Sequence, residues 1–296
     1  MQSEIGSTSS NQKMATILGI DAAWTAGEPS GVALVTQKDA LWRCVAVAPS
    51  YESFLALANG TKIDWTARPV GTQPDVRQLL EAAASLAGDD VSVITIDMPV
   101  ATVPIDGRRA ADRLVSQKFG ARGCSTHSPG PIRPGRLGAA LTRQCASLGF
   151  DLAVDDTACG TAKRLVEVYP HLALLTLLNR EYRVPYKVSK SANYWPGTRL
   201  TDRIDRLLLE FAAIESGLQS FISNISIPLP PSTPMMILSG LKRFEDALDA
   251  LICCWVGACY LERNATALGD STGAIWWPTH QKTKAFSEGL QNRLPA

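Results

Sequence analysis

The sequence is poor in the residues that build the commonest zinc and hydrolase sites. It has three histidines among 296 residues, and its seven cysteines include no pair with the C-x-x-C spacing of zinc sites. Ser125, Ser128 and the cysteines have no companion base at a recognisable spacing, so the sequence does not favour nucleophilic catalysis by serine or cysteine. Structural zinc and covalent hydrolysis are therefore poor explanations for this chain.

Long apolar runs and an excess of one charge are also absent from the sequence. No uncharged apolar stretch reaches about 18 residues, and no basic-plus-apolar segment opens the chain, so we expect neither a membrane span nor a secretory leader. The 29 basic and 28 acidic residues nearly cancel, which argues against a surface that attracts polyanions overall but allows a local basic patch. The odd number of cysteines, with Cys253 and Cys254 adjacent in a hydrophobic stretch, indicates reduced thiols and a cytoplasmic protein.

The chain has enough apolar residues for a sizeable core, with 46% hydrophobic and 19% charged residues. We expect a flexible Ser-rich tail at 1–14, a single domain at 15–280 and a polar tail at 281–296. Three strands with short links open the domain and favour an antiparallel meander. The expected strands are 16–21, 30–36, 40–48, 91–97 and 164–170, and the expected helices are 75–88, 107–120, 171–180, 199–217 and 242–263.

Acidic residues recur where apolar segments end. Asp21 follows the run TILGI and Asp97 follows VSVITI, while Asp246 and Asp249 lie three residues apart on one face of an expected helix. Each acid alone is compatible with a turn, a cap or a helix-terminal position. A buried unpaired carboxylate is costly, however, so a cluster of four needs cations or donors. Together they form the oxygen-rich cluster that one or two hard divalent cations require.

The choice of metal follows from the type of ligand. Oxygen ligands without soft partners favour Mg²⁺ or Mn²⁺ over Zn²⁺. We expect Asp21, Asp97 and Asp249 to be the metal ligands, with Asp246 completing the catalytic set. Two such metals can activate water and stabilise the leaving oxygen of a phosphodiester, so a two-metal carboxylate site is expected.

Basic residues lie near the expected acids in sequence. Arg108 and Arg109 follow the strand of Asp97, and Lys187 and Lys190 belong to a second cluster that is interleaved with aromatic residues. Such patterns suit phosphate contacts and single-stranded or distorted nucleic acid, although an ordinary solvated surface has the same composition. A Gly-, Pro- and Arg-rich stretch at 121–138 resembles a mobile binding loop and contains His127, which could transfer protons.

Five motifs in order give the chain a family resemblance. GIDAAW, ITIDMPV, GRRAADRLV, LVEVYPHLAL and FEDALDAL together resemble the domain-of-unknown-function 429 family of predicted RNase H-like nucleases, over about residues 16–278. The resemblance implies an RNase H-like α/β fold, closest to the Holliday-junction resolvases, with a five-stranded mixed sheet in which two strands join the meander. Helices flank this sheet.

The resemblance also implies roles for single residues. Asp21 matches the acid of the first strand, Asp97 that of the fourth, and Asp246 with Asp249 the acidic pair of the late helix. Glu167 matches an acid on the fifth strand that supports the metal ligands or orients substrate. The family usually has a more basic loop where this chain has CSTHSPGPIRPG, so the nature of the substrate stays open.

Three functions are compatible with these features. The favoured one is a metal-dependent nuclease that hydrolyses phosphodiester bonds of DNA or RNA. A non-catalytic module that binds nucleic acid or protein would keep the fold without a converging acid cluster. An ATP-binding phosphotransferase of the actin and sugar-kinase type is disfavoured, because Gly27 and Gly31 do not form the compact phosphate hairpin that this class needs after Asp21.

Overall fold

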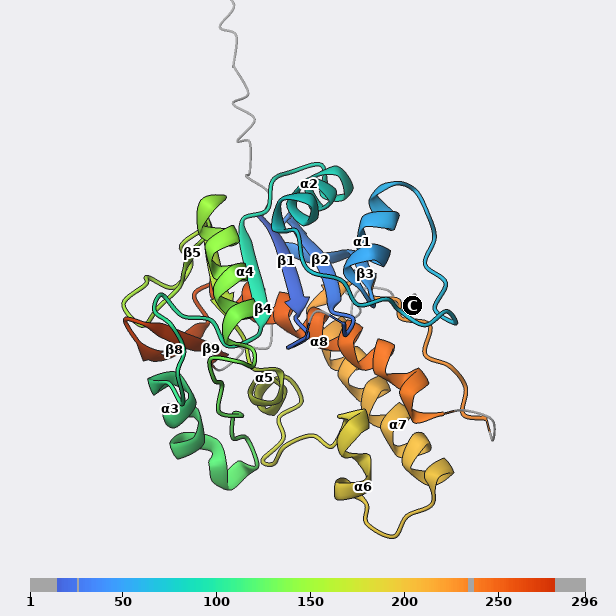
Figure 1. Cartoon of the computed structure of the whole chain (residues 1–296). Helices are drawn as coiled ribbons and strands as arrows, with labels where there is room; N and C mark the ends of the chain where they lie inside the picture. The colour runs from blue at the N-terminus through green and yellow to red at the C-terminus, as the bar shows by residue number, and fades with distance from the viewer. Residues whose placement is uncertain (1–14, 26, 234–236, 280–296) are drawn as a thin grey trace, which may run out of the picture.

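The computed structural model describes residues 15–25, 27–233 and 237–279 and shows a mixed α/β fold (Figure 1). The expected tails at 1–14 and 281–296 lie outside these residues. The strands are β1 (Ala15–Asp21), β2 (Gly31–Lys38), β3 (Leu41–Ala48), β4 (Val93–Asp97), β5 (Asp151–Leu152), β6 (Arg164–Glu167), β7 (Ile222–Ser223), β8 (Ala265–Asp270) and β9 (Gly273–Pro278). The α-helices are α1 (Tyr51–Ala58), α2 (Val76–Ala87), α3 (Ala110–Phe119), α4 (Gly135–Ser147), α5 (Pro170–Leu177), α6 (Ser191–Tyr194), α7 (Leu200–Gln219) and α8 (Leu238–Leu261), and two 3-10 helices are η1 (Gly120–Arg122) and η2 (Val188–Lys190).

The strands form one mixed sheet in the order β7-β3-β2-β1-β4-β6-β9-β8, with β5 paired to β6 off this path. The first three strands make the expected antiparallel meander, and β4 and β6 extend it in parallel beside β1. The expectation of five strands was wrong, because the sheet has nine. Two of the additional strands, β5 and β7, are two residues long, too short for a period-2 pattern to reveal.

The β8–β9 hairpin extends the sheet beyond the expected fifth strand. β9 pairs in parallel with β6 through Glu167 and Ile275, and β8 pairs antiparallel with β9. The fifth strand itself ends at Glu167, three residues earlier than expected, because the helix α5 begins at Pro170. Proline is favoured in the first turn of a helix, where its missing N–H has no intrahelical partner to lose.

Helices cover both faces of the sheet. Apolar residues of α5, α7 and α8 pack on the face that Ile17 shares, whereas α1, α2 and α4 pack on the face that Leu18 and Ile20 share (Figure 1). The alternation of side chains along β1 therefore divides the core into two layers. A smaller cluster joins α3 to the β8–β9 hairpin.

The long helix α8 lies directly on β1 and β2. A Cβ atom at Gly19 would lie 2.4 Å from the carbonyl oxygen of Ala250, and one at Gly31 would lie 2.0 Å from that of Asp246. Toward the other end of β1, Gly257 of α8 faces Ile17. The helix thus runs along β1 with its acidic N-terminal half beside the strand end that carries Asp21.

The expected loop at 121–138 is shorter in the structure. Its first residues belong to η1, and α4 starts at Gly135. Glycines that suggested flexibility serve close packing instead: a Cβ at Gly135 would lie 2.5 Å from the carbonyl oxygen of Gly130, and one at Gly138 equally close to that of Pro99. The irregular segment that carries His127 is limited to residues 123–134.

Candidate functional site

The two strand-end acids lie side by side. Asp21 and Asp97 are the last residues of β1 and β4, and they are Cα partners in the parallel register of these strands. Asp21 shares its face of the sheet with Ile17 and Gly19, and Asp97 shares the same face with Val93, so both point to the side that α8 covers. The expected juxtaposition of these acids is present in the structure.

This pair of carboxylates has no hydrogen-bond donor among the described residues. Within the described part of the chain, no side-chain or backbone donor bonds to either acid. Burial raises the pKa of Asp97 well above its usual range, and the charges of Asp21 and Asp249 raise it further, although Lys187 opposes them. The strand ends thus form an electrostatically unfavourable pair that a cation would stabilise.

Asp249 of α8, by contrast, is fully paired. Its Oδ1 accepts a hydrogen bond of 2.6 Å from the hydroxyl of Tyr186, and its Oδ2 forms an ion pair with Nζ of Lys187. Burial raises the pKa of Asp249 to about 7. Lys187 opposes this rise, whereas the negative charges of Asp21 and Glu245 add to it. Both oxygens of this expected metal ligand are therefore occupied by protein donors.

The other acids of α8 also form ion pairs with lysines. Nζ of Lys242 forms an ion pair with Asp246 and lies 3.0 Å from Oε1 of Glu245. Glu245 also lies 3.4 Å from Lys187 and accepts the backbone N–H of Val188 at 2.6 Å. Although burial acts to raise it, the two lysines hold the pKa of Glu245 below its usual value. Glu245 was not predicted, although Lys242 precedes it by three residues, a spacing typical of helical ion pairs.

The described residues 15–25, 27–233 and 237–279 contain no group of three His, Cys, Asp or Glu side chains that could hold a metal ion. The four predicted acids do converge on the same end of the sheet, but lysines supply the positive charge on the helix side. The expected three-ligand set of Asp21, Asp97 and Asp249 stays a prediction. In the structure, Asp249 forms an ion pair with Lys187.

Glu167 belongs to a separate buried cluster. It points away from the face that holds Val166 and Val168, as the alternation along the strand predicts. Arg109 binds it with both terminal nitrogens at 2.6 Å and also binds Asp112 at 3.0 Å. Burial raises the pKa of Glu167 even though Arg109 opposes this shift.

Arg109, the predicted substrate contact, is mostly buried in this cluster, although it also lines a cavity. Its side chain is 7% exposed, and one of its nitrogens also donates to the carbonyl oxygen of Val100 at 2.7 Å. Arg108 is the exposed member of this pair and donates to the backbone oxygen of Asp112 and the hydroxyl of Ser116. The sequence showed a basic run, but only packing distinguishes its buried arginine from its solvated one.

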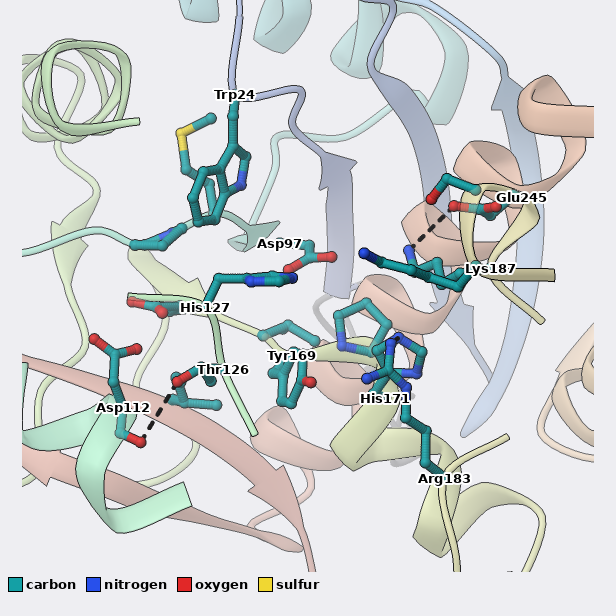
Figure 2. A pocket seen from close by; sticks show the side chains of 18 of the residues that line it. Trp24, Asp97, Asp112, Thr126, His127, Tyr169, His171, Arg183, Lys187 and Glu245 are labelled. Carbon is teal, nitrogen blue, oxygen red and sulfur yellow. Dashed lines mark hydrogen bonds and ion pairs between the residues drawn. The ribbon is translucent and has the colours of Figure 1, made fainter. Parts of the chain in front are cut away.

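A cavity of about 260 Å³ opens beside Asp97 (Figure 2). Segments far apart in the sequence line it: Trp24 just after β1, the end of β4, the irregular segment with His127, the start of α5, the residues around Lys187, the N-terminal part of α8, and Ile275 of β9. Asp97 is the strand-end acid that lines the cavity, together with Glu167, Glu245 and the predicted basic residues Arg109, Lys187 and Lys190. Asp21, Asp246 and Asp249 are not part of its lining.

Several residues of the cavity escaped sequence analysis. Trp24 lies three residues after Asp21 and meets His127 edge to face, with ring centroids 6.5 Å apart. On another wall, Arg183 forms a hydrogen bond with Nε2 of His171. Burial lowers the pKa of His171 well below its usual value, and the charges of Lys187 and Arg183 lower it further. The imidazole is therefore neutral at pH 7 and accepts from the guanidinium.

The fold and the site define a mixed α/β protein with a carboxylate pair at the edge of a basic and aromatic cavity. A family model described as "Protein of unknown function (DUF429)" matches residues 19–272. The chain belongs to this family, which confirms the resemblance that the five motifs suggested. Neither the curated proteins nor the solved structures contain a significant match. None of the helices in the described residues is long and apolar enough to cross a membrane.

Proposed function

We propose that this protein is a metal-dependent hydrolase that cleaves phosphodiester bonds of nucleic acid at the Asp21–Asp97 pair. The observation that carries the proposal is the in-register alignment of these two acids at adjacent strand ends, without protein donors in the described residues, beside a cavity with cationic side chains. Two carboxylates held this close on rigid strands are unfavourable alone, and a bound cation would offset their repulsion.

The residues present fit one divalent cation better than two. Mg²⁺ is commonly bound through one or two carboxylates, with waters and substrate phosphates completing its coordination, and Asp21 with Asp97 would supply two. When bound, such a cation supplies positive charge for the phosphate oxygens and acidifies water. The two-metal site predicted from sequence needs further oxygen ligands from α8, but those of Asp249 already accept from Tyr186 and Lys187.

Three side chains at the cavity, those of Lys187, Lys190 and His127, have roles in the proposed reaction that do not require them to bind the metal. Lys187, paired with Asp249, lines the cavity and would place a fixed positive charge beside the substrate phosphate. Lys190 is exposed at the same wall. His127 is exposed on the opposite side, in contact with Trp24, where it could donate a proton to the leaving oxygen.

The Asp97→Asn variant tests the proposal directly. We expect it to lower the cleavage rate by more than about 100-fold, because loss of a ligand charge misplaces both the cation and the attacking water. The assay uses branched DNA, RNA–DNA hybrid and single-stranded RNA with Mg²⁺ or Mn²⁺. Asp90→Asn is the matched control, since Asp90 is exposed just before the opposite end of β4. Equal rates for wild type and Asp97→Asn would overturn the assignment.

The same variant should also change the stability of the protein. The pKa of Asp97 is higher in the folded chain than in the unfolded chain. Such an acid lowers the free energy of unfolding of the protein as the pH rises from the unfolded to the folded pKa. In EDTA, Asp97→Asn should be more stable than wild type, by a larger margin at pH 7 than at pH 4, near the usual pKa of an aspartate. Adding Mg²⁺ should stabilise wild type and not the variant. Urea denaturation at both pH values, with and without Mg²⁺, measures these differences, and a constant margin would contradict the prediction.

A non-catalytic binding module is the second candidate function. The observation in its favour is that Lys187 and Lys242 form ion pairs with Glu245, Asp246 and Asp249, so protein cations already offset most of the charge of the acids of α8. This function predicts nucleic-acid binding without cleavage by the wild type in either metal.

A further inference from the structure

The charges around the cavity are of two kinds. Lys187 and Lys242 are each paired with carboxylates of α8, and Arg109 is paired with Glu167 and Asp112. Arg183 and Lys190 also line the cavity, yet neither forms an ion pair with a carboxylate in the part of the chain that the structure describes. Arg183 and Lys190 are therefore cavity-lining cations without a carboxylate partner among the described residues, which favours an anionic group in the cavity.

Arg183 is positioned by a neutral partner. Arginine has no acceptor, so the imidazole nitrogen that faces it must accept, and the low pKa of His171 keeps that nitrogen unprotonated. His171 is 4% exposed and lies at the start of α5, where helix packing fixes its ring. The guanidinium is thus held without loss of its charge, and its planar fork suits the oxygens of a phosphate.

The opposite part of the cavity is aromatic. Trp24 is partly buried, His127 is exposed, and the two rings meet at 83° (Figure 2). Tyr169 lines the other part of the cavity, where its ring centroid lies 5.7 Å from that of His171. Aromatic rings beside a cationic wall are the combination with which proteins bind unpaired nucleotides, since every base has a face that can stack. Asp97 lies between these two sides of the cavity in Figure 2.

The size of the cavity limits what can enter it. A volume of about 260 Å³ lies just below the range of typical small-ligand sites, about 300–1,000 Å³. One nucleotide is of this scale, whereas a double helix can only lie across the opening. A base within a duplex cannot reach the aromatic wall unless it leaves its stack, which costs a few kcal/mol.

We infer that the cavity binds one unpaired nucleotide, with its base at Trp24 and His127 and its phosphate at Arg183 and Lys190. The inference rests on the proposed function for the reaction that follows binding, and it specifies the substrate as a single strand or a frayed end. Arg183 is then a phosphate-binding residue, and His171 is a positioning residue that acts through it.

Binding to the wild-type chain in EDTA separates this inference from catalysis. We expect a fluorescent single-stranded oligonucleotide to bind at least 10-fold more tightly than a blunt duplex of the same sequence. Trp24→Ala should weaken single-strand binding by about 5- to 150-fold, the range for losing one stacked base. Trp195→Ala is the matched control, because Trp195 is similarly exposed and does not line the cavity. Duplex binding as tight as single-strand binding would overturn the inference.

Competition with small ligands tests the two ends of the cavity separately. A nucleoside monophosphate should compete better than the nucleoside. Arg183→Met should remove this advantage, and Arg183→Lys should keep most of it. Trp24→Ala should weaken the binding of both competitors alike. Arg180→Met is the control, because Arg180 is exposed three residues away and outside the cavity. An effect of Arg183→Met no larger than that of Arg180→Met would overturn the phosphate assignment.

The outcomes also separate this inference from the proposed function. Strong single-strand binding without cleavage in Mg²⁺ or Mn²⁺ would overturn the hydrolase and support the nucleotide cavity. Cleavage of duplex and single strand with equal efficiency and equal affinity would overturn the cavity assignment alone. A nucleoside monophosphate that binds as tightly as the oligonucleotide would support the nucleotide chemistry and overturn the strand as its source. Thermal melting of each variant confirms that it is folded.

Discussion

Replacing Lys187 by methionine is expected to lower the free energy of unfolding by about 3–5 kcal/mol, the cost of removing one partner of a buried ion pair. Its ammonium group contacts Asp249, which is fully buried, and lies 3.4 Å from Glu245. Burial acts to lower the pKa of Lys187, but Asp249 and Glu245 raise it well above its usual value, so the group is charged throughout the neutral range. Methionine keeps the apolar stem and leaves the carboxylates without this cation.

Urea denaturation in EDTA measures this effect, and two variants serve as controls. Lys190→Met removes a lysine three residues away that is exposed and unpaired in the described structure, so it should change stability by no more than about 0.5 kcal/mol. Lys187→Met combined with Asp249→Asn should recover part of the loss, because the stranded charge is removed as well. Mg²⁺ should stabilise Lys187→Met more than wild type. A Lys187→Met variant as stable as wild type in EDTA would show that the ion pair is not a structural support.

A similar loss is expected for Arg109→Met, again about 3–5 kcal/mol. This change leaves two buried carboxylates, Glu167 and Asp112, whose side chains are 3% and 1% exposed, without their guanidinium partner. The first turn of α3 also loses the contact between Arg109 and Asp112. Because Glu167 is on β6 beside β4, the loss should extend from α3 to the strand that carries Asp97.

The adjacent Arg108→Met change provides a matched control for this cluster. Arg108 is exposed and its guanidinium contacts a hydroxyl and a backbone oxygen, so a change of about 0.5 kcal/mol or less is expected. Adding Asp112→Asn and Glu167→Gln to Arg109→Met should restore part of the stability. If equilibrium denaturation gave equal losses for Arg108→Met and Arg109→Met, the cluster would not have the energetic role that its burial implies.

The sequence predicted the central part of the fold because that part is periodic. The strands that contain Ile17 and Ile96 are continuous apolar runs, and α8 is a long apolar helix, so local pattern and tertiary burial agree there. The two shortest of the additional strands, β5 and β7, were missed for a different reason. β5 and β7 exist because a neighbouring strand offers them hydrogen bonds, and such a partner cannot be read from two residues.

The same distinction explains the predictions for the site. Strand ends that share a sheet edge follow from topology, which is why Asp21 and Asp97 could be paired from sequence. The cation that meets Asp249 comes from Lys187, 62 residues earlier, and no local spacing connects the two. The sequence thus predicts the acids and Lys187 as site residues, but not the ion pair that joins Lys187 to Asp249. Lys187 meets Asp249 because the chain just before η2 passes beside α8, and this path is not encoded in a local pattern.

The cavity draws its walls from nearly the whole described chain, from Trp24 near the end of β1 to Ile275 on β9. A ribosome releases the segments in order, and α8 and β9 emerge last. Until they leave the exit tunnel, β1 and β4 lack the helix that lies on them, and the cavity lacks one wall. The long sequence separations also make this assembly a late step in folding. A nascent chain therefore has a complete cavity only after α8 and β9 have left the exit tunnel.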